Sequence, residues 1–274
     1  MRTVYLGTSD FAAAILARLA DTPHRPALVV TRPDRPKGRG RKLQSPPVAD
    51  LARVLGLPLD QPQDVNGDEA RERIAQARPE AIVVCAFGAL IKEPLLSDHE
   101  MLNVHPSLLP RWRGAAPVER AIMAGDRETG VAIMRLTEGL DSGPVCLMER
   151  ETIRDDDSYG SLSLRLQDIG ASLLIRALDE RPPFVEQSQE GITYAEKLTA
   201  EDRTLDPDAT AIEQERVVRA LSPHVGARLA LDDGSFLGVR AAKAREDGTL
   251  ELIEVQPPGG RPMPYADYLR GHGG

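Results

Sequence analysis

Residues 101–117 read Met-Leu-Asn-Val-His-Pro-Ser-Leu-Leu-Pro-Arg-Trp-Arg-Gly-Ala-Ala-Pro, and the rest of the chain is organised around them. They begin as a short apolar run, which predicts a strand, and continue as a loop restricted by proline and glycine. Asn103 and His105 stand two positions apart in that run. Alternate side chains of a strand face the same side of a sheet, so the amide and the imidazole should project together.

A carboxylate in a later loop extends this pair. Asp141 lies 36 residues after His105, between Gly139 and Gly143. An amide, a titratable imidazole and a carboxylate on separate loops suit a reaction that passes through a tetrahedral oxyanion. Taken singly, the histidine is more simply a hydrogen-bonded core residue and the aspartate a turn former. The three residues together favour an active site.

The bulk composition restricts the class of protein. With 274 residues, 41% hydrophobic and 28% charged, the chain can bury a full core and should hold more than one domain. A formal net charge of −8 argues against a general polyanion-binding protein but is compatible with a local basic patch. Cys85 and Cys146 lie in apolar runs without metal-ligand spacing, which predicts buried thiols. We find no apolar signal region and no membrane-length run, so we expect a cytoplasmic protein without a membrane partner.

Strands and helices alternate through the first 180 residues. We expect strands at 3–6, 27–31, 57–60, 81–86, 129–136 and 145–151, and helices at 11–19, 48–55, 69–77, 118–124 and 158–178. A short apolar helix should open at 87–91. The fully apolar run at 81–86 is typical of a central parallel strand buried on both faces. The pattern predicts an α/β fold with a doubly wound, mostly parallel sheet.

Two loops of this region are suited to anions or polar groups. Gly7, Thr8 and Ser9 form a turn before the first helix, whose N-terminus can receive such a group, although the dinucleotide-binding glycine pattern is absent. Six of the eleven residues at 32–42 are basic, and the proline and glycine around them predict a long flexible loop through 47 without regular structure. Its place after a parallel strand favours phosphate binding over a simple solvated charge run.

The composition shifts near residue 183. We assign 1–183 to a catalytic domain, 184–208 to a polar linker and 209–274 to a small β-rich domain. In the last segment a predicted helix precedes short β-like runs separated by Asp-Gly and Pro-Gly turns, which suggests a small antiparallel sheet or truncated barrel. Residues 192–274 carry 10 Lys and Arg against 14 Asp and Glu, so this part is not an obvious nucleic-acid platform.

Over essentially its whole length the chain resembles the methionyl-tRNA formyltransferases, which belong to the folate-dependent formyltransferases. Four stretches carry the resemblance, and they are Gly7-Thr8-Ser9-Asp10-Phe11-Ala12, the basic segment 32–40, the segment 103–117 and the segment 130–143. The last two are typical of folate-dependent formyltransferases at large. The basic loop together with Arg-Gly-Ala-Ala-Pro narrows the resemblance to the tRNA enzymes.

The chain departs from the family pattern in several places. Ser9 stands where the family usually has proline, Pro106 where it has a small residue, and His224-Val225 where it has Trp-Pro. A few strands' worth of residues are also missing between Ala244 and Thr249. In the family the C-terminal domain is a small β-barrel that helps to hold the tRNA, so this shortening bears on the substrate more than on the reaction.

The resemblance implies a Rossmann-like formyltransferase fold and transfer of a formyl group from 10-formyltetrahydrofolate to the α-amine of methionine on initiator tRNA, bound by its acceptor stem. It implies catalytic roles for Asn103, His105 and Asp141 and no metal, and we expect a monomer. The residues implied for folate binding are Phe87, Gly88, Leu90, Ile91, Ser107, Leu108, Leu109, Pro110, Leu140 and Gly143, with core packing as the competing interpretation for Leu90 and Ile91. Those implied for the tRNA substrate are Gly7, Thr8, Ser9, Arg39, Arg41, Lys42 and Arg113.

Other functions remain open from the sequence. A formyltransferase acting on a sugar nucleotide would share the Asn, His and Asp residues and suit a reduced C-terminal domain, but such enzymes generally lack the Gly-Arg-Gly loop. A formyl-folate hydrolase is less expected, because that group carries an additional N-terminal regulatory domain and the first predicted strand here already begins at Thr3. A non-enzymatic binding module would bind nucleotide or folate without turnover, and the complete set of three polar groups argues against it.

Overall fold

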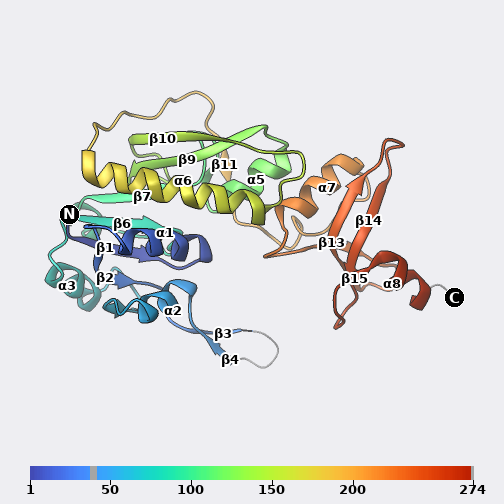
Figure 1. Ribbon diagram of the computed structural model, residues 1–274, viewed down its shortest axis with the longest axis horizontal. Coiled ribbons are helices and arrows are strands. Elements are labelled where there is room, and N and C mark those ends of the chain that lie inside the picture. The colour runs from blue at the N-terminus through green and yellow to red at the C-terminus, as the bar shows by residue number, and fades with distance from the viewer. Residues whose placement is uncertain (38–41, 273–274) are drawn as a thin grey trace. The chain divides into compact units, whose positions relative to one another are not determined.

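The computed structural model describes residues 1–37 and 42–272, and the chain forms two compact units (Figure 1). The first unit consists of Met1–Arg113, Gly130–Glu151 and Leu164–Thr193, and the second of Gly114–Thr129, Thr152–Ser163 and Tyr194–Gly274. Each unit therefore draws on several segments of the chain. Whether the expected segments 1–183, 184–208 and 209–274 fold as separate domains stays a prediction.

A seven-stranded sheet forms the centre of the first unit, in the order β10-β9-β7-β6-β1-β2-β5. Its strands are β1 (Thr3–Gly7), β2 (Pro26–Val30), β5 (Leu59–Asp60), β6 (Ala81–Cys85), β7 (Met101–His105), β9 (Glu128–Arg135) and β10 (Val145–Thr152). The run from β7 to β5 is parallel, and β9 pairs antiparallel with β7. β1 and β6 are buried along their whole length, as an apolar central strand requires.

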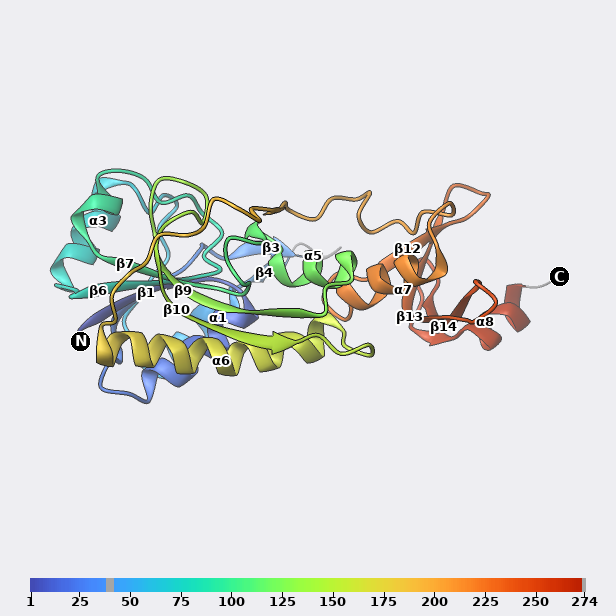
Figure 2. The same cartoon turned by 90° about the horizontal axis from the view of Figure 1, so that it is seen from above.

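Helices cover both faces of this sheet. They are α1 (Asp10–Ala20), α2 (Pro47–Val54), α3 (Asp68–Gln76), α4 (Leu95–Asp98) and α6 (Tyr159–Glu180). Ile74 of α3 and Leu95 of α4 pack into the core on one face. On the other face Gly170 of α6 comes close to Ile15 of α1 and Val104 of β7. Figure 2 shows α3 and α6 on opposite sides of the strands. The predicted doubly wound, mostly parallel α/β fold is confirmed.

The predicted helix at 87–91 is wrong. The chain runs there as a loop between β6 and α4. Ala86 and Gly88 have positive φ values of 42° and 73°, which an α-helix excludes, so an apolar sequence is not sufficient for a helix here.

The basic segment contains regular structure, contrary to the prediction. β3 (Arg35–Lys37) and β4 (Lys42–Gln44) form an antiparallel two-stranded sheet in which Pro36 faces Leu43. Proline is tolerated in such a pair because each strand has only one neighbour with which to exchange hydrogen bonds.

The second unit packs helices on a small antiparallel sheet. Its elements are α5 (Pro117–Ala124), β11 (Tyr194–Ala195), α7 (Ala211–Ala220), β12 (Ala227–Ala230), β13 (Phe236–Ala244), β14 (Leu250–Gln256), β15 (Met263–Pro264) and α8 (Tyr265–His272), while the two-residue strand β8 (Arg113–Gly114) precedes α5. The sheet order is β12-β13-β14-β15. α7 begins with a complete capping box between Thr210 and Glu213. The predicted small antiparallel C-terminal sheet is confirmed, whereas α8 was not expected.

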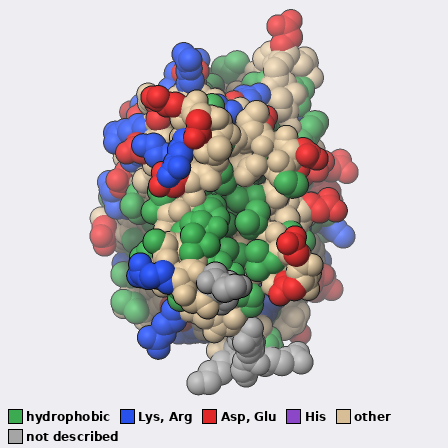
Figure 3. Space-filling model, turned by 90° about the vertical axis from the view of Figure 1, so that its right-hand side faces the viewer, with side chains coloured by type: hydrophobic (Ala, Val, Ile, Leu, Met, Phe, Trp, Pro, Cys, Tyr) green, Lys and Arg blue, Asp and Glu red, His purple; other side chains and the backbone are tan. Residues whose placement is uncertain are grey.

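The sheet of the second unit has a core face and an outer face. Val218 of α7 and Val239 of β13 form a buried cluster that Leu252 of β14 joins. The next residue, Ile253, is half exposed, as is Leu269 of α8. Apolar side chains also gather at the centre of the face drawn in Figure 3, between acidic and basic side chains.

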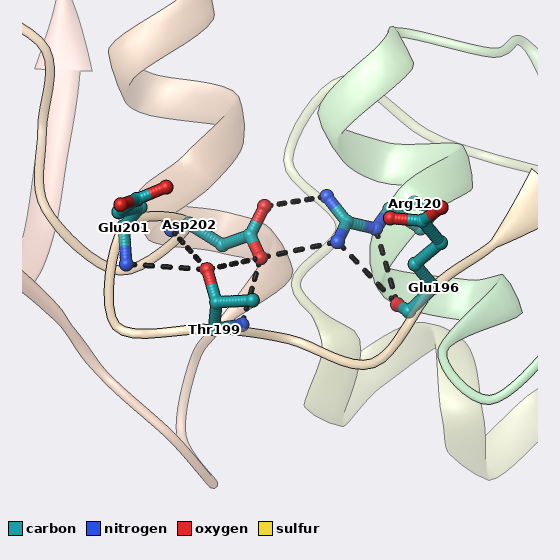
Figure 4. A network of polar contacts seen from close by, with 5 residues as sticks. All are labelled: Arg120, Glu196, Thr199, Glu201 and Asp202. Carbon is teal, nitrogen blue, oxygen red and sulfur yellow. Dashed lines mark hydrogen bonds and ion pairs between the residues drawn. The ribbon is translucent and has the colours of Figure 1, made fainter.

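A partly buried polar network ties the segment before α7 to α5 (Figure 4). The Arg120 guanidinium donates to both carboxylate oxygens of Asp202, at 2.6 and 3.1 Å, and also to the carbonyl of Glu196. Thr199 donates to Asp202 through its backbone N–H and its hydroxyl. Burial by itself would raise the pKa of Asp202, but the hydrogen bonds from Arg120 and Thr199 outweigh it and hold the pKa below its usual value.

Candidate active site

β7 brings Asn103 and His105 to the same side of the sheet, as the alternation predicts. The strand is buried throughout and pairs with β6 on one side and β9 on the other. Asn103 is 8% exposed and His105 4%. Because neighbouring strands fix the backbone on both sides, the sheet itself sets where these two polar groups lie.

Asp141 meets both residues from a loop between β9 and β10. The Asn103 side-chain Nδ2 donates to Asp141 Oδ1 at 3.2 Å, and His105 Nδ1 lies 3.6 Å from Asp141 Oδ2. One carboxylate therefore faces the amide and the imidazole with separate oxygens. Asp141 has a φ of 42°, a left-handed conformation that aspartate tolerates better than most residues but that still costs energy.

A main-chain carbonyl determines which nitrogen of His105 carries a proton. His105 Nε2 lies 2.8 Å from the carbonyl oxygen of Trp112. A carbonyl can only accept, so Nε2 is the protonated nitrogen and Nδ1 presents its lone pair toward Asp141. Trp112 has a φ of 61°, and its N–H donates to Thr193 Oγ1 at 2.9 Å. The ring nitrogen that is left to accept a hydrogen bond, Nδ1, is therefore the one that faces the Asp141 carboxylate.

The turn after β1 lies beside the loop at 87–91. Thr8 Oγ1 donates to the Phe87 carbonyl at 2.7 Å. Ser9 caps α1, because its Oγ accepts a hydrogen bond from the Ala12 N–H. At Gly7 a Cβ would lie 2.7 Å from the Tyr5 ring, so this position has no room for a side chain.

The loop at 87–91 lines a cavity of about 360 Å³. Phe87, Gly88 and Leu90, which we predicted to bind folate, are part of its wall. The other lining residues are Arg32, Pro62, Gln63, Asp64, Val65, Asn66, Ala89 and Lys92. Leu90 is 68% exposed, whereas Ile91 packs in the hydrophobic core. Folate binding by either residue stays a prediction.

Several other residues predicted to bind folate have structural contacts. The Ser107 hydroxyl is buried and donates to the Arg111 carbonyl at 2.7 Å, and Leu109 packs in a small core cluster. Leu108 and Pro110 are partly exposed beside them. Leu140 is an exposed apolar side chain next to Asp141. These contacts hold the segment 107–110 in place, and folate binding by its residues and by Leu140 stays a prediction.

Residues predicted to contact tRNA fall into different environments. Arg39 and Arg41 lie outside the described residues. Lys42 begins β4, where its backbone pairs with Lys37. Arg113 is 6% exposed, and its guanidinium donates to Gln187 Oε1 at 3.1 and 2.8 Å. A buried arginine needs a fixed partner, and Gln187 supplies it. The predicted contact of Arg113 with tRNA stays a prediction.

Two residues near the site were not expected from the sequence. Gln187 and Thr193 lie in the segment expected to be a linker, yet both belong to the first unit. Thr193 holds the backbone of Trp112, and Gln187 contacts the Asp141 loop. No local pattern distinguishes them, because a polar residue in a polar stretch is the ordinary composition of a loop.

Residues 1–37 and 42–272 offer neither a metal site nor a membrane-spanning helix. They contain no group of three or more His, Cys, Asp or Glu side chains placed to hold a metal ion. None of the helices in this part of the chain is both long and apolar enough to cross a membrane. Cys85 is a buried free thiol as predicted, whereas Cys146 is only partly buried.

The chain is similar to known formyltransferases along its whole length. The family described as formyl transferase matches residues 1–178. The methionyl-tRNA formyltransferase of Halorhodospira halophila is 41% identical over 298 residues, which covers 98% of this chain and 96% of that protein. That of Thermus thermophilus is 42% identical over 296 residues, with coverage of 100% and 97%. Both alignments are longer than this chain, so each relative has residues that this chain lacks.

Solved structures share the fold at lower sequence identity. The methionyl-tRNA formyltransferase from Clostridium thermocellum superimposes with a TM-score of 0.69 at 15% identity, covering 93% of this chain and 98% of that one. HypX from Aquifex aeolicus in complex with tetrahydrofolic acid gives a TM-score of 0.70 at 18% identity, covering 98% of this chain and 47% of that one.

Proposed function

The chain belongs to the methionyl-tRNA formyltransferases, a family of folate-dependent enzymes, and we propose that it transfers the formyl group with Asn103, His105 and Asp141 as catalytic residues. The observation that carries this assignment is the meeting of the three side chains at one carboxylate, with Asp141 Oδ1 on the Asn103 amide and Oδ2 toward His105 Nδ1.

Asn103 supplies the donor for developing negative charge. When an amine attacks a formyl carbonyl, the carbonyl oxygen gains charge and needs a donor already in place. The Asn103 Nδ2 has two hydrogens, and Asp141 Oδ1 fixes one of them. The other hydrogen is the donor that we assign to the formyl oxygen. A donor held in advance by a buried partner avoids reorganisation as the charge develops.

His105 moves the proton. The attacking nitrogen has to lose a proton, and the leaving nitrogen has to gain one. Because the Trp112 carbonyl keeps Nε2 protonated, Nδ1 is the nitrogen that accepts the proton, and Asp141 Oδ2 then faces the charged ring. Asp141 thus acts on both steps: it orients the amide and stabilises the imidazolium.

We propose 10-formyltetrahydrofolate as the formyl donor. This co-substrate supplies the formyl group on N10. Its pterin is a flat ring with polar edges and apolar faces, and needs a slot with both kinds of lining. The cavity beside 87–91 combines the apolar Phe87 and Leu90 with the carboxylate of Asp64 and is large enough for one ring system. Leu140, beside Asp141, is the apolar contact that we assign at the reacting end.

Methionine esterified to initiator tRNA is the proposed acceptor. The family relationship supports the methionyl-tRNA substrate, and the basic segment supports binding of acceptor-stem phosphates by Arg39, Arg41 and Lys42. The Gly7-Thr8-Ser9 turn at the α1 N-terminus is the proposed contact for a polar group at the acceptor end. We propose that the enzyme acts as a monomer.

A competition between acceptors tests this function. The purified chain is incubated with 10-formyltetrahydrofolate and either methionyl-tRNA or an amino-sugar nucleotide, and the formylated product is measured by mass spectrometry. We expect formyl-methionyl-tRNA and no turnover of the sugar nucleotide. Formylation of the sugar nucleotide alone would assign the chain to the alternative reaction, and loss of turnover in Asn103→Ala would identify this site as its source.

A further inference from the structure

Gln187 joins the Asp141 loop to the interior of the first unit. Its side chain is 8% exposed. Its Nε2 donates to the carbonyl of Asp141 at 2.9 Å and to that of Gly143 at 2.7 Å. Its Oε1 accepts hydrogen bonds from both the Nε and an Nη of Arg113. One buried amide thus makes four hydrogen bonds, two to the loop and two to a buried cation.

The chemistry of these partners fixes the orientation of the amide. A guanidinium has donors only, and main-chain carbonyls have lone pairs only. The oxygen of Gln187 must therefore face Arg113, and its NH₂ must face the two carbonyls; the flipped amide would place donor against donor and acceptor against acceptor. Arg113 in this way determines where the two N–H groups of Gln187 point.

The Asp141 loop needs such a restraint. Asp141 adopts a φ of 42°, which a non-glycine residue avoids unless its surroundings enforce it. The two carbonyls that Gln187 binds flank Ser142, so the amide closes the loop on both sides of that residue. At Gly143 a Cβ would press against the Arg135 carbonyl, which shows that the loop lies directly on β9. The backbone that Gln187 holds is the backbone from which the Asp141 carboxylate projects.

We propose that Gln187 is a positioning residue for catalysis: by holding the Asp141 and Gly143 carbonyls, it keeps the Asp141 carboxylate between Asn103 and His105, with Arg113 as its anchor. This inference rests on the proposed roles of Asp141 and its partners. It assigns to the segment before β11 a function in the reaction, where the sequence suggested a linker.

Gln187→Glu tests the two donors separately from the anchor. The glutamate keeps an acceptor for Arg113, so the buried cation retains a partner, but it presents oxygen instead of N–H to the loop carbonyls. We expect kcat to fall about 100-fold, because a displacement of about 1 Å in a catalytic group costs that much, while KM for methionyl-tRNA changes less than about threefold. Gln187→Asn, which is too short to reach all its partners, is a second, uncharged variant with the same expectation.

Gln214→Glu is the matched control. Gln214 in the second unit also donates through Nε2 to two main-chain carbonyls, those of Asp206 and Ala209, at 3.0 and 2.9 Å. The same substitution there should leave kcat within about threefold of the unmodified enzyme.

A double-mutant cycle decides whether Gln187 acts through Asp141. In the Asp141→Ala background Gln187→Glu should lower kcat by less than about threefold, because the carboxylate that it positions is gone. The pH–rate profile of Gln187→Glu should also change in the same direction as that of Asp141→Asn. The inference would be overturned if the losses in kcat caused by Asp141→Ala and Gln187→Glu were fully additive, or if kcat were unchanged in both Gln187 variants. The proposed function would still stand in either case, provided that the wild-type chain turns over. Absence of transfer by the wild-type chain would refute the function itself.

Discussion

Replacement of Gly143 by alanine should displace the Asp141 loop and slow the reaction. The added Cβ would lie 2.9 Å from the Thr137 methyl group and closer still to the Arg135 carbonyl oxygen. Relaxed contacts of a methyl carbon are about 3.5–4.0 Å, so the loop has to move by at least about 1 Å. The Arg135 carbonyl belongs to β9 and cannot turn aside, so the displacement falls on the loop that carries Asp141.

A shift of this size predicts a specific kinetic result. A misplacement of about 1 Å in a catalytic group costs about 100-fold in rate, and overpacking costs about 1–3 kcal/mol of stability. We therefore expect kcat for formyl transfer to fall about 100-fold in a protein that still unfolds cooperatively, with KM for methionyl-tRNA nearly unchanged. The assay is steady-state formylation of methionyl-tRNA, with thermal unfolding measured on the same samples.

Gly271→Ala is the control for the added methyl group. At Gly271, near the end of α8, nothing lies within 4 Å of the new Cβ, so kcat should not change and stability should not fall, because alanine is the better helix former. If Gly143→Ala kept full kcat, the placement of Asp141 would not matter for the reaction, and the reasoning from loop geometry would be refuted.

Three further predictions concern other parts of the molecule. Asn103→Ala removes the donor assigned to the formyl oxygen and should lower kcat about 10²–10³-fold in the same assay; retention of turnover would exclude that role. Burial would raise the pKa of Asp202, but hydrogen bonds from Arg120 and Thr199 keep it below its usual value. Ionised Asp202 therefore stabilises the fold at pH values above the ordinary carboxyl pKa. This stabilisation disappears as pH falls through the lowered pKa. Urea unfolding should therefore show that Asp202→Asn is less stable than wild type at pH 7 and that the gap narrows toward pH 3; a gap independent of pH would contradict this. Burial raises the pKa of the Cys85 thiol to about 12, so iodoacetamide at pH 8 should label Cys85 only after denaturation, as peptide mass spectrometry can establish.

The sequence predicted those parts of the site that follow from a regular spacing of residues along one segment of the chain. Asn103 and His105 alternate on an apolar strand, and their common side follows from that spacing. The doubly wound sheet likewise follows from apolar runs that alternate with amphipathic ones. The meeting of Asp141 with Asn103 and His105 was expected because the three groups together suit a reaction through a tetrahedral oxyanion, and the flanking glycines indicated that Asp141 lies in a tight loop.

What the sequence did not predict depends on contacts between distant residues. The segment 87–91 is apolar enough for a helix, yet its carbonyls accept hydrogen bonds from Thr8, Arg32 and Asn66. Gln187 has no local pattern that marks it, and its role depends on three residues more than 40 positions away. Arg113 was assigned to the tRNA substrate by resemblance alone, and no local pattern indicated that its side chain is buried against Gln187.

The pH–rate profile of Asp141→Asn tests the central claim most directly. Asparagine keeps the size of the side chain and tolerates the left-handed backbone at this position, but it removes the charge that faces His105 Nδ1 at 3.6 Å. If one carboxylate orients the amide and stabilises the imidazolium, kcat should fall by at least about 100-fold and its dependence on pH should change. An unchanged kcat with an unchanged profile would contradict the account.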